Sequence, residues 1–128
     1  MAHILLVEPD RLLAKTYAKA LQQQGHHVLS AQDAQSAINA TDAVTPDMVI
    51  LELQLPHHNG IEFLYELRSH ADWHDLPVVI LSQLTPDQLE FDVNSYEELG
   101  IKAFCYKSDT SLTTLNKLVE EVINTAKK

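Results

Sequence analysis

Short apolar runs alternate along the chain with segments in which apolar residues recur at helical spacing. Two of the runs, 4–7 and 78–81, are apolar throughout, which is typical of strands that are covered on both faces. We predict five strands: HILLV (3–7), HVLSA (27–31), DMVILE (47–52), PVVILS (77–82) and AFCYK (103–107). The alternation predicts an α/β domain in which a parallel sheet lies between helices.

Helical periodicity is clearest after the first predicted strand and near the C-terminal end. Leu13, Tyr17 and Leu21 stand at i, i+4 and i+8 and form one apolar stripe. A second stripe is formed by Leu112, Leu115, Val119, Val122 and Ile123. Asp33 before AQSAINA and Asn59-Gly60 before IEFLYELR predict the starts of two further helices.

A fourth helix is predicted between the fourth and fifth strands. Thr85-Pro86-Asp87-Gln88 supplies an N-cap, a proline at the first helical position and a capping-box glutamine. Leu99-Gly100 supplies a C-cap signal for the same helix. Each strand is then followed by a helix, and the chain is expected to contain five βα units.

Composition and charge limit the classes of partner. The 128 residues, of which 45% are apolar, are expected to form one domain. The formal net charge of −9 disfavours nucleic acid and anionic membranes as partners, because both need a basic face. No apolar run approaches the roughly 20 residues that span a bilayer. Cys105 is the single cysteine, which excludes an internal disulfide and favours a reducing cytoplasm.

Polar side chains stand at the carboxyl ends of four predicted strands, where ligands bind in open sheets of this kind. The segments are Glu8-Pro9-Asp10, Glu52, Ser82-Gln83 and Lys107-Ser108. Carboxylates supply the oxygen ligands that a magnesium ion prefers, and a lysine and a hydroxyl suit a phosphoryl group. This combination indicates phosphotransfer chemistry.

The segments ILLVEPD, PDMVILELQLPHHNG, PVVILSQ and AFCYKSD resemble, in order and spacing, the signature segments of the receiver domain of two-component response regulators. The resemblance covers almost the whole chain. It implies a flavodoxin-like, doubly wound, five-stranded parallel sheet of (βα)5 topology with strand order 2-1-3-4-5, as a single receiver-like domain over residues 1–128. It also implies a protein partner, either a histidine kinase or a regulatory protein.

The resemblance assigns roles by position. In the family, an aspartate at the end of the third strand accepts a phosphoryl group from a phosphohistidine with the help of a magnesium ion. The phosphoacceptor position falls on Glu52, and the residues that contact the phosphoryl group fall on Ser82 and Lys107. The two acids that hold the metal after the first strand fall on Glu8 and Pro9.

Several residues depart from the family pattern around the metal position. Pro9 offers no side-chain oxygen, so Glu8 is left as one carboxylate of a sparse site, and we expect no metal to be bound. Asp10 adds an acid to the pocket in sequence, but beside Pro9 it is interpreted as a helix N-cap. Gln83 replaces a small residue and is expected to narrow access to the pocket.

Glu52 itself has two interpretations. Its carboxylate extends one methylene further than that of aspartate, toward Ser82 and Lys107, and in one interpretation it imitates the phosphorylated state. In the other, Glu52 only pairs with Lys107 and holds the edge of the sheet together. Both interpretations predict that ordinary aspartyl phosphorylation is lost and that no cofactor is needed.

The resemblance also implies an output surface. In the family, an aromatic residue of the fifth strand follows the phosphoryl-contacting hydroxyl inward and changes the face made by the fourth helix, fifth strand and fifth helix. Phe104 stands at this switch position, with core packing as its alternative role. A homodimer through this face is one candidate assembly. Cys105, which points to the opposite side of the strand, is predicted to be buried and unreactive.

Seven histidines raise the question of a metal site. His70 and His74 are spaced i, i+4 beside two carboxylates, but no third convergent ligand is evident. A solvated connector is therefore favoured over a zinc site. His57-His58 follows Glu52, and a surface-loop role is expected for this pair.

Three functions can be compared on this basis. The first is a non-enzymatic, phosphorylation-independent interaction module, an atypical receiver or pseudo-receiver, which Pro9, Glu52 and Gln83 favour. The second is a functional phosphoacceptor that uses Asp10 for magnesium or Glu52 for the phosphoryl group, which the retained hydroxyl and lysine keep open. The third is a flavodoxin-like enzyme or flavin-binding protein, which is disfavoured because VEPDRLLA contains no glycine- or hydroxyl-rich phosphate loop. We rank them in this order.

Overall fold

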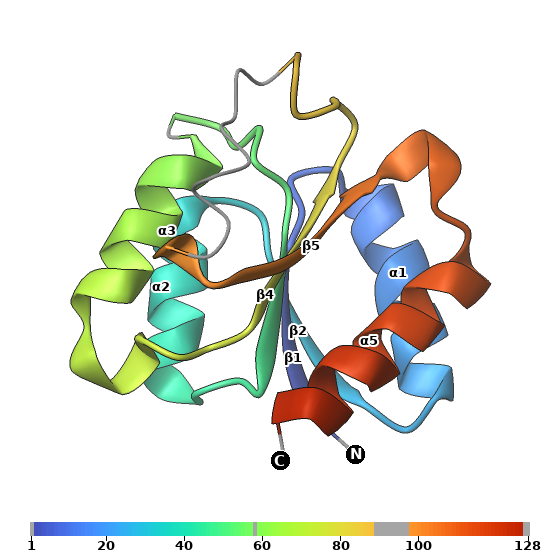
Figure 1. Cartoon of the computed structure of the whole chain (residues 1–128), viewed down its shortest axis with the longest axis horizontal. Helices are drawn as coiled ribbons and strands as arrows, with labels where there is room; N and C mark the ends of the chain where they lie inside the picture. The colour runs from blue at the N-terminus through green and yellow to red at the C-terminus, as the bar shows by residue number, and fades with distance from the viewer. Residues whose placement is uncertain (1, 58, 89–97, 127–128) are drawn as a thin grey trace.

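The computed structural model describes residues 2–57, 59–88 and 98–126. Its parallel strands form one five-stranded sheet in the order β2-β1-β3-β4-β5, which confirms the expected flavodoxin-like topology (Figure 1). The strands are β1 (His3–Val7), β2 (His27–Ala31), β3 (Met48–Leu51), β4 (Val78–Ser82) and β5 (Ile101–Tyr106). The helices are α1 (Arg11–Gln23), α2 (Ala34–Ala43), α3 (Gly60–Ser69) and α5 (Leu112–Ala126), with short 3-10 helices η1 (Ala71–Trp73) and η2 (Lys107–Asp109).

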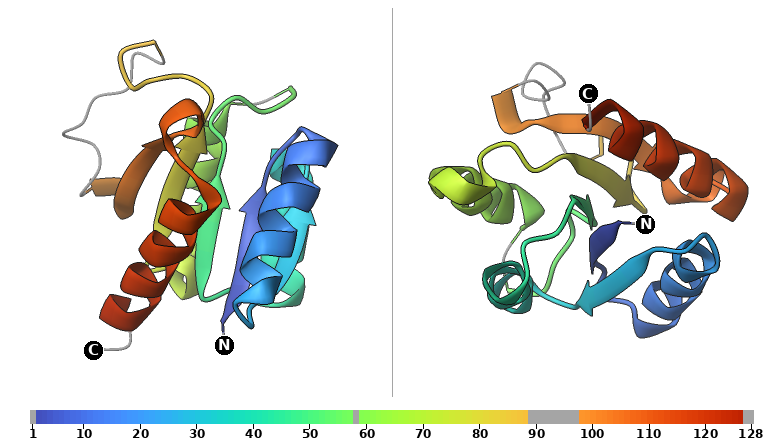
Figure 2. Two further views of the ribbon diagram at one scale, coloured as in Figure 1. Left: turned by 90° about the vertical axis from the view of Figure 1, so that its right-hand side faces the viewer. Right: turned by 90° about the horizontal axis from the view of Figure 1, so that it is seen from below.

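Two apolar cores lie on the two faces of the sheet. Helices α2 and α3 cover one face and α1 and α5 cover the other (Figures 1 and 2). Successive residues of β1 point to opposite cores, Leu5 and Val7 to the first and Ile4 and Leu6 to the second. Strands β1, β3 and β4 are thus buried on both sides, which explains their continuously apolar sequences. None of the described helices is long and apolar enough to cross a membrane.

The helix starts were predictable from local sequence. Asp10, Asp33 and Asn59 are the N-caps of α1, α2 and α3, and each side chain accepts a hydrogen bond from a backbone N–H two or three residues ahead. A cap of this kind contributes about 1 kcal/mol to helix stability. The interpretation of Asp10 as a cap is therefore confirmed.

The body of the predicted fourth helix, residues 89–97, lies outside the described residues. At its predicted start, the backbone N–H of Thr85 donates to Oε1 of Gln88 at 2.9 Å, and that of Gln88 donates to Oγ1 of Thr85 at 3.3 Å. These are the reciprocal bonds of a capping box. At its predicted end, Gly100 has a φ of +70°, the left-handed conformation that commonly follows a helix.

β5 begins two residues earlier than predicted, and its pairing with β4 is uneven. The register shifts near the start of β4, so that Lys102 is left without a partner on that strand, as in a β-bulge. The shift makes Tyr106, and not Cys105, the partner of Ser82. Lys107 therefore follows directly after the last residue pair of the two strands.

The prediction of a buried Cys105 needs correction. Its side chain does face the core under α1 and α5, opposite to Phe104, but it is only partly buried because β5 is an edge strand. Burial raises the pKa of the thiol, and a hydrogen bond with Thr110 lowers it in part. The reactive thiolate is consequently scarce at neutral pH.

The side chain of Arg68, in the last turn of α3, fixes the segment that leads into β5. Its guanidinium donates to backbone carbonyls in the two segments that precede β4 and β5. The acceptors are Leu99, Trp73, His74, Leu76 and Gly100, at 2.6–3.4 Å. A planar fork with several fixed donors can satisfy this set, whereas an ammonium group cannot.

We predict that Arg68→Lys lowers the free energy of unfolding by about 2–4 kcal/mol, because it leaves partly buried carbonyls without a donor. Urea denaturation followed by circular dichroism measures this change. Arg11→Lys is the matched control, since Arg11 is exposed, and its effect should stay within about 0.5 kcal/mol. Equal effects of the two substitutions would contradict the role assigned to Arg68.

Candidate functional site

Four side chains meet where the central strands end. Glu8 follows β1, Glu52 follows β3, Ser82 ends β4, and Lys107 begins η2 directly after β5. Because these strands are parallel and adjacent in the sheet, their carboxyl ends lie along one edge. The sequence-predicted residues of the site are thus brought together, apart from Asp10 and Phe104.

Lys107 lies between the two buried carboxylates. Its Nζ is 2.6 Å from Oε1 of Glu8 and 2.9 Å from Oε1 of Glu52. The side chains of Lys107, Glu8 and Glu52 are only 10%, 3% and 2% exposed. Buried carboxylates of this kind are tolerated only when a cation and hydrogen-bond donors compensate for lost water, and Lys107 supplies the cation to both.

Three further donors surround the carboxylate of Glu52. The hydroxyl of Ser82 donates to Oε2 at 2.6 Å, and the backbone N–H groups of Gln54 and Gln83 donate to Oε2 and Oε1, both at 3.1 Å. The hydroxyl oxygen of Ser82 also accepts from the backbone N–H of Leu84 at 3.2 Å. Each oxygen of Glu52 therefore accepts two hydrogen bonds, and the group is held in one orientation.

The protonation of this pair follows from its contacts. Burial would raise the pKa of the Glu52 carboxyl, but the donors, Ser82 and Lys107 foremost, outweigh burial and lower it. Burial would likewise lower the pKa of Lys107, but the bonds with Glu8 and Glu52 prevail and raise it. At neutral pH the site therefore contains one ammonium and, at Glu52, an ionised carboxylate.

Tyr17 of α1 borders this network, although its sequence spacing indicated only a place in the core. Burial raises the pKa of its phenol, the positive charge of Lys107 lowers it in part, and the carboxylates of Glu8 and Glu52 raise it further. The phenol remains neutral at physiological pH. A tyrosine in a helical stripe carries no local signal for this contact, since the site residues come from other elements.

The residues after β1 do not complete a metal site. Oε2 of Glu8 accepts from the backbone N–H of Asp10 at 3.1 Å, and Oε1 is taken by Lys107. The carboxylate of Asp10 caps α1, and Pro9 has no side-chain oxygen. Among the described residues, no group of three or more His, Cys, Asp or Glu side chains could hold a metal ion. The magnesium ion implied by the family resemblance therefore does not fit the residues present.

The loop after Glu52 folds back over the strand ends. Gln54 and Asn59 form an antiparallel bridge, and the N–H of Gly60 donates to the carbonyl of Leu53 at 2.7 Å. A Cβ on Gly60 would lie 2.7 Å from Cα of Leu53, so only glycine permits this approach. The side-chain amide of Gln83 donates to that of Gln54 at 2.6 Å. This bond joins the segments that follow β3 and β4, on either side of Glu52.

Phe104 belongs to the core under α2 and α3. It pairs with Ile80 across the sheet and packs, partly buried, against the core under α2 and α3. Core packing, the alternative role considered for this residue, accounts for these contacts. The face that Phe104 would control also includes residues 89–97, which are outside the described residues.

The histidine clusters noted in the sequence have ordinary surroundings. The ring of His70 lies 4.3 Å from that of Trp73, and His57 is exposed, while His58 lies outside the described residues. His26, which is deeply buried, was not singled out by the sequence. Its ring nitrogens contact the backbone N–H of Ala2 at 3.2 Å and the carboxylate of Glu120 at 2.8 Å, which connects the residues just before β1 and β2 to α5.

Comparison with known proteins gives one consistent family. The family described as the response regulator receiver domain matches residues 4–120. The chain is 34% identical over 82 residues to the KDP operon transcriptional regulatory protein KdpE of Escherichia coli, which covers 64% of the chain and 35% of that protein. It is 33% identical over 79 residues to the phosphate regulon transcriptional regulatory protein PhoB of Escherichia coli, covering 62% of the chain and 34% of that protein.

Solved structures agree on the fold. The chemotaxis protein CheY4 of Vibrio cholerae superimposes with a TM-score of 0.83 at 22% identity, over 95% of this chain and 98% of the other. The matched regions span about a third of the length of the curated relatives. The family match covers most of the chain, and the strand order of the sheet is that expected for this family. The chain belongs to the response regulator receiver domain family of two-component signalling.

Proposed function

We propose that this receiver domain acts as a phosphorylation-independent protein-interaction module, with Glu52 in place of the phosphoacceptor aspartate. The observation that carries the proposal is the position of Lys107, whose ammonium binds Glu8 and Glu52 at once. Part of the charge that a metal ion would neutralise is compensated from within the chain, by one ammonium between two carboxylates. The domain therefore works as a scaffold with a fixed site, in the cytoplasm, and without a cofactor.

The engagement of Glu52 supports the loss of phosphotransfer. A phosphoacceptor must present a carboxylate oxygen to the incoming phosphorus, with a divalent cation to offset the developing charge. Here both oxygens of Glu52 accept hydrogen bonds and the side chain is 2% exposed. Attack through either oxygen would require one of its hydrogen bonds to break first, such as that from Ser82 to Oε2 or that from Lys107 to Oε1.

The same bonds support a constitutive signalling state. Ser82 and Lys107 are the positions that contact a phosphoryl group in the family, and both donate to Glu52. Glu52 thus accepts hydrogen bonds from both residues although no phosphoryl group has been transferred. In the proposal, the output is contact with another protein, a histidine kinase or a regulatory protein, or with a second copy, through the face that contains β5 and α5.

The metal site is expected to be recoverable by substitution. In the wild-type protein, we predict no saturable amide shifts near Glu8 and Glu52 when magnesium, and then magnesium with beryllofluoride, is added in an NMR titration. The double variant Pro9→Asp, Glu52→Asp should show saturable shifts. It adds a carboxylate at position 9 and shortens the side chain at position 52, whose carboxylate is bound by Lys107 in the wild-type protein. Pro9→Asn with Glu52→Asp is the matched control that adds no charge at position 9.

Saturable shifts in the wild-type protein that spread from Glu52 to Phe104 would refute the proposal and favour a functional phosphoacceptor. If neither the wild-type protein nor the double variant shows saturable shifts, the residues at positions 9 and 52 alone do not explain the loss of the metal. The geometry of the strand ends would then exclude it.

The buried ion pair also predicts a pH profile of stability. Because the pKa of Glu52 is lowered by folding, its contribution is present above about pH 4.3, its unfolded value, and is lost as the pH falls through the folded value. Because the pKa of Lys107 is raised, its contribution is present below about pH 10.4 and is lost as the pH rises through the folded value. Thermal unfolding should therefore give a plateau between these limits.

Glu52→Gln tests the acid limb of this profile. The variant should fold, because the ion pair between Lys107 and Glu8 remains. Its free energy of unfolding at neutral pH should be about 1–3 kcal/mol lower than that of the wild-type protein. Its Tm should fall less steeply than that of the wild-type protein below about pH 4.3. If the Tm of the variant and that of the wild-type protein fall equally steeply in acid, other carboxylates govern the acid transition.

A further inference from the structure

Strand β2 forms an outer edge of the sheet, and no described strand pairs with its outer side. The opposite edge strand, β5, carries an exposed lysine, Lys102, at an irregularity in its pairing with β4. Charges and bulges of this kind protect edges from pairing with other chains. The sequence of β2, HVLSA, contains no lysine, arginine, acid or proline and pairs evenly with β1. β2 is therefore the less protected edge.

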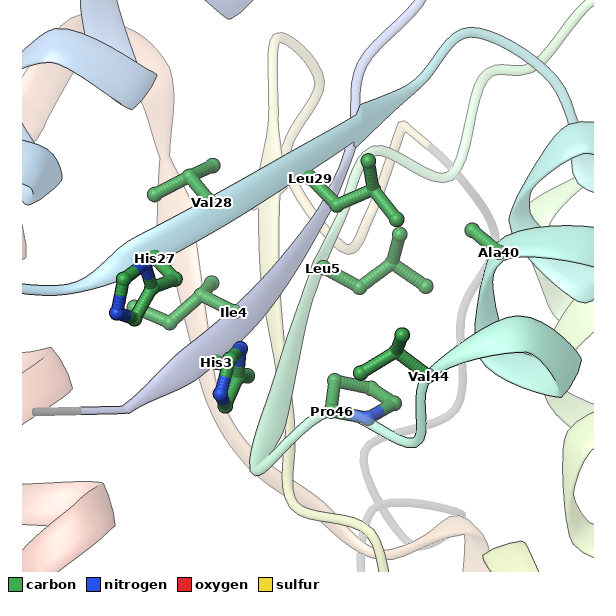
Figure 3. Close-up of a pocket in the computed structure, with 9 residues that line it drawn as sticks. All are labelled: His3, Ile4, Leu5, His27, Val28, Leu29, Ala40, Val44 and Pro46. Carbon is green, nitrogen blue, oxygen red and sulfur yellow. The ribbon is translucent and has the colours of Figure 1, made fainter.

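An apolar hollow flanks β2 on the side of α2. Leu29 of β2 and Val44 after α2 are 50% and 54% exposed, and both line the same pocket. Figure 3 shows these residues around one pocket, with the rings of His3 and His27 at its end. The two rings stack at 4.9 Å. The lining is completed by Ile4, Leu5, Val28, Ala40 and Pro46.

A cationic groove flanks β2 on the side of α1. Arg11, Lys15 and Lys19 follow one another at i, i+4 and i+8 on the exposed surface of α1, and this helix contains no acid. Within the described part of the chain, none of the three pairs with a carboxylate. Arg11 and Lys15 line a groove together with Ala14, Ala18, Ser30, Ala31, Gln32 and Ser36. In a chain of net charge −9, this is a local site for negative charge.

The two hollows lie on opposite faces of the same edge. Figure 2 shows β2 at the margin of the sheet between α1 and α2. Val28 packs with the core under α1, and Ala31 packs with the core under α2. By strand alternation, Ser30 then points to the α1 side and Leu29 to the α2 side. Side chains of any strand added to β2 would alternate between the cationic groove and the apolar hollow.

We propose that β2 accepts an extended segment of a partner protein in which acidic residues alternate with apolar residues. Main-chain hydrogen bonds to the free edge supply affinity, as in other complexes formed by strand addition. The acidic side chains meet Arg11 and Lys15, and the apolar side chains enter the hollow beside Leu29. This surface is separate from the face that contains β5 and α5, and it does not depend on the state of Glu52.

Charge disfavours a second copy of the chain as the occupant. Two copies paired antiparallel through β2 about a two-fold axis would place both α1 helices on the same face of the joined sheet. The rows that contain Arg11 and Lys15 would then face each other across the seam, with like charges close together. A segment with acidic residues replaces this repulsion by attraction.

The test uses an acetylated, amidated peptide of alternating Glu and Val and an NMR titration of the isotope-labelled protein. We expect saturable shifts at 27–31 and along α1 near Lys15, which weaken as salt is added. A peptide of the same composition, with its Glu and Val residues in two blocks, is the control for alternation and should bind at least about threefold more weakly.

Two matched pairs of variants locate the contacts. Lys15→Glu should weaken binding about three- to tenfold, whereas Lys19→Glu, which makes the same charge change outside the groove, should alter it less than about twofold. Leu29→Gln should weaken binding about three- to tenfold, whereas Leu112→Gln, an exposed leucine on α5, should have no effect beyond about twofold. Glu52→Gln should bind like the wild-type protein, which separates this proposal from that for the carboxylate site.

The proposal is overturned by any of four results. These are no saturable shift at millimolar peptide, equal affinity for the block peptide, equal effects of Lys15→Glu and Lys19→Glu, or concentration-dependent shifts at 27–31 without peptide. The last result would mean that a second copy occupies the edge.

Discussion

The site depends on one ammonium group placed between two buried carboxylates. The side chains of Glu8 and Glu52 are nearly inaccessible to water, and a carboxylate is costly to bury without a partner. Lys107 serves both, and Ser82 and backbone N–H groups supply the remaining donors to Glu52. Since these residues come from the ends of β1, β3, β4 and β5, the ion pairs also connect strands that no single loop joins.

The position of Lys107 is a consequence of strand register. The unpaired residue in β5 advances the register by one, so Tyr106 pairs with Ser82 and Lys107 comes directly after that pair. Without the unpaired residue, each side chain of β5 that follows it would point to the face of the sheet opposite to the one it now occupies. The irregularity thus affects both the reach of the lysine and the direction of Phe104, although it lies at the far end of the strand.

The sequence predicted what short-range rules determine. Strands β1 and β2, the caps Asp10, Asp33 and Asn59, and the convergence of polar residues at the strand ends all follow from apolar patterning and local hydrogen bonding. The start of β5 was misplaced because its unpaired residue depends on the partner strand, which periodicity within one segment does not reveal.

Other features depend on tertiary contacts and had no local signal. Arg68 ends a helix, where a basic residue commonly faces solvent, but its acceptors lie 5 to 32 positions away in the chain. His26 follows a turn after α1 and is buried only because Ala2 and Glu120 supply its polar contacts. The pairing of Lys107 with Glu52 was one of two interpretations, and the simultaneous contact with Glu8 was not considered.

The presence of proline at position 9 and the contact of Lys107 with two carboxylates fit together electrostatically. Three carboxylates at these strand ends would exceed what a single ammonium can compensate, and a divalent cation would be needed. With proline at position 9, and with Asp10 turned to cap α1, only Glu8 and Glu52 remain in the buried network. One lysine and the surrounding hydrogen-bond donors then suffice. In the proposed function, the proline thus removes one ligand of the metal and lowers the number of acids that Lys107 has to compensate.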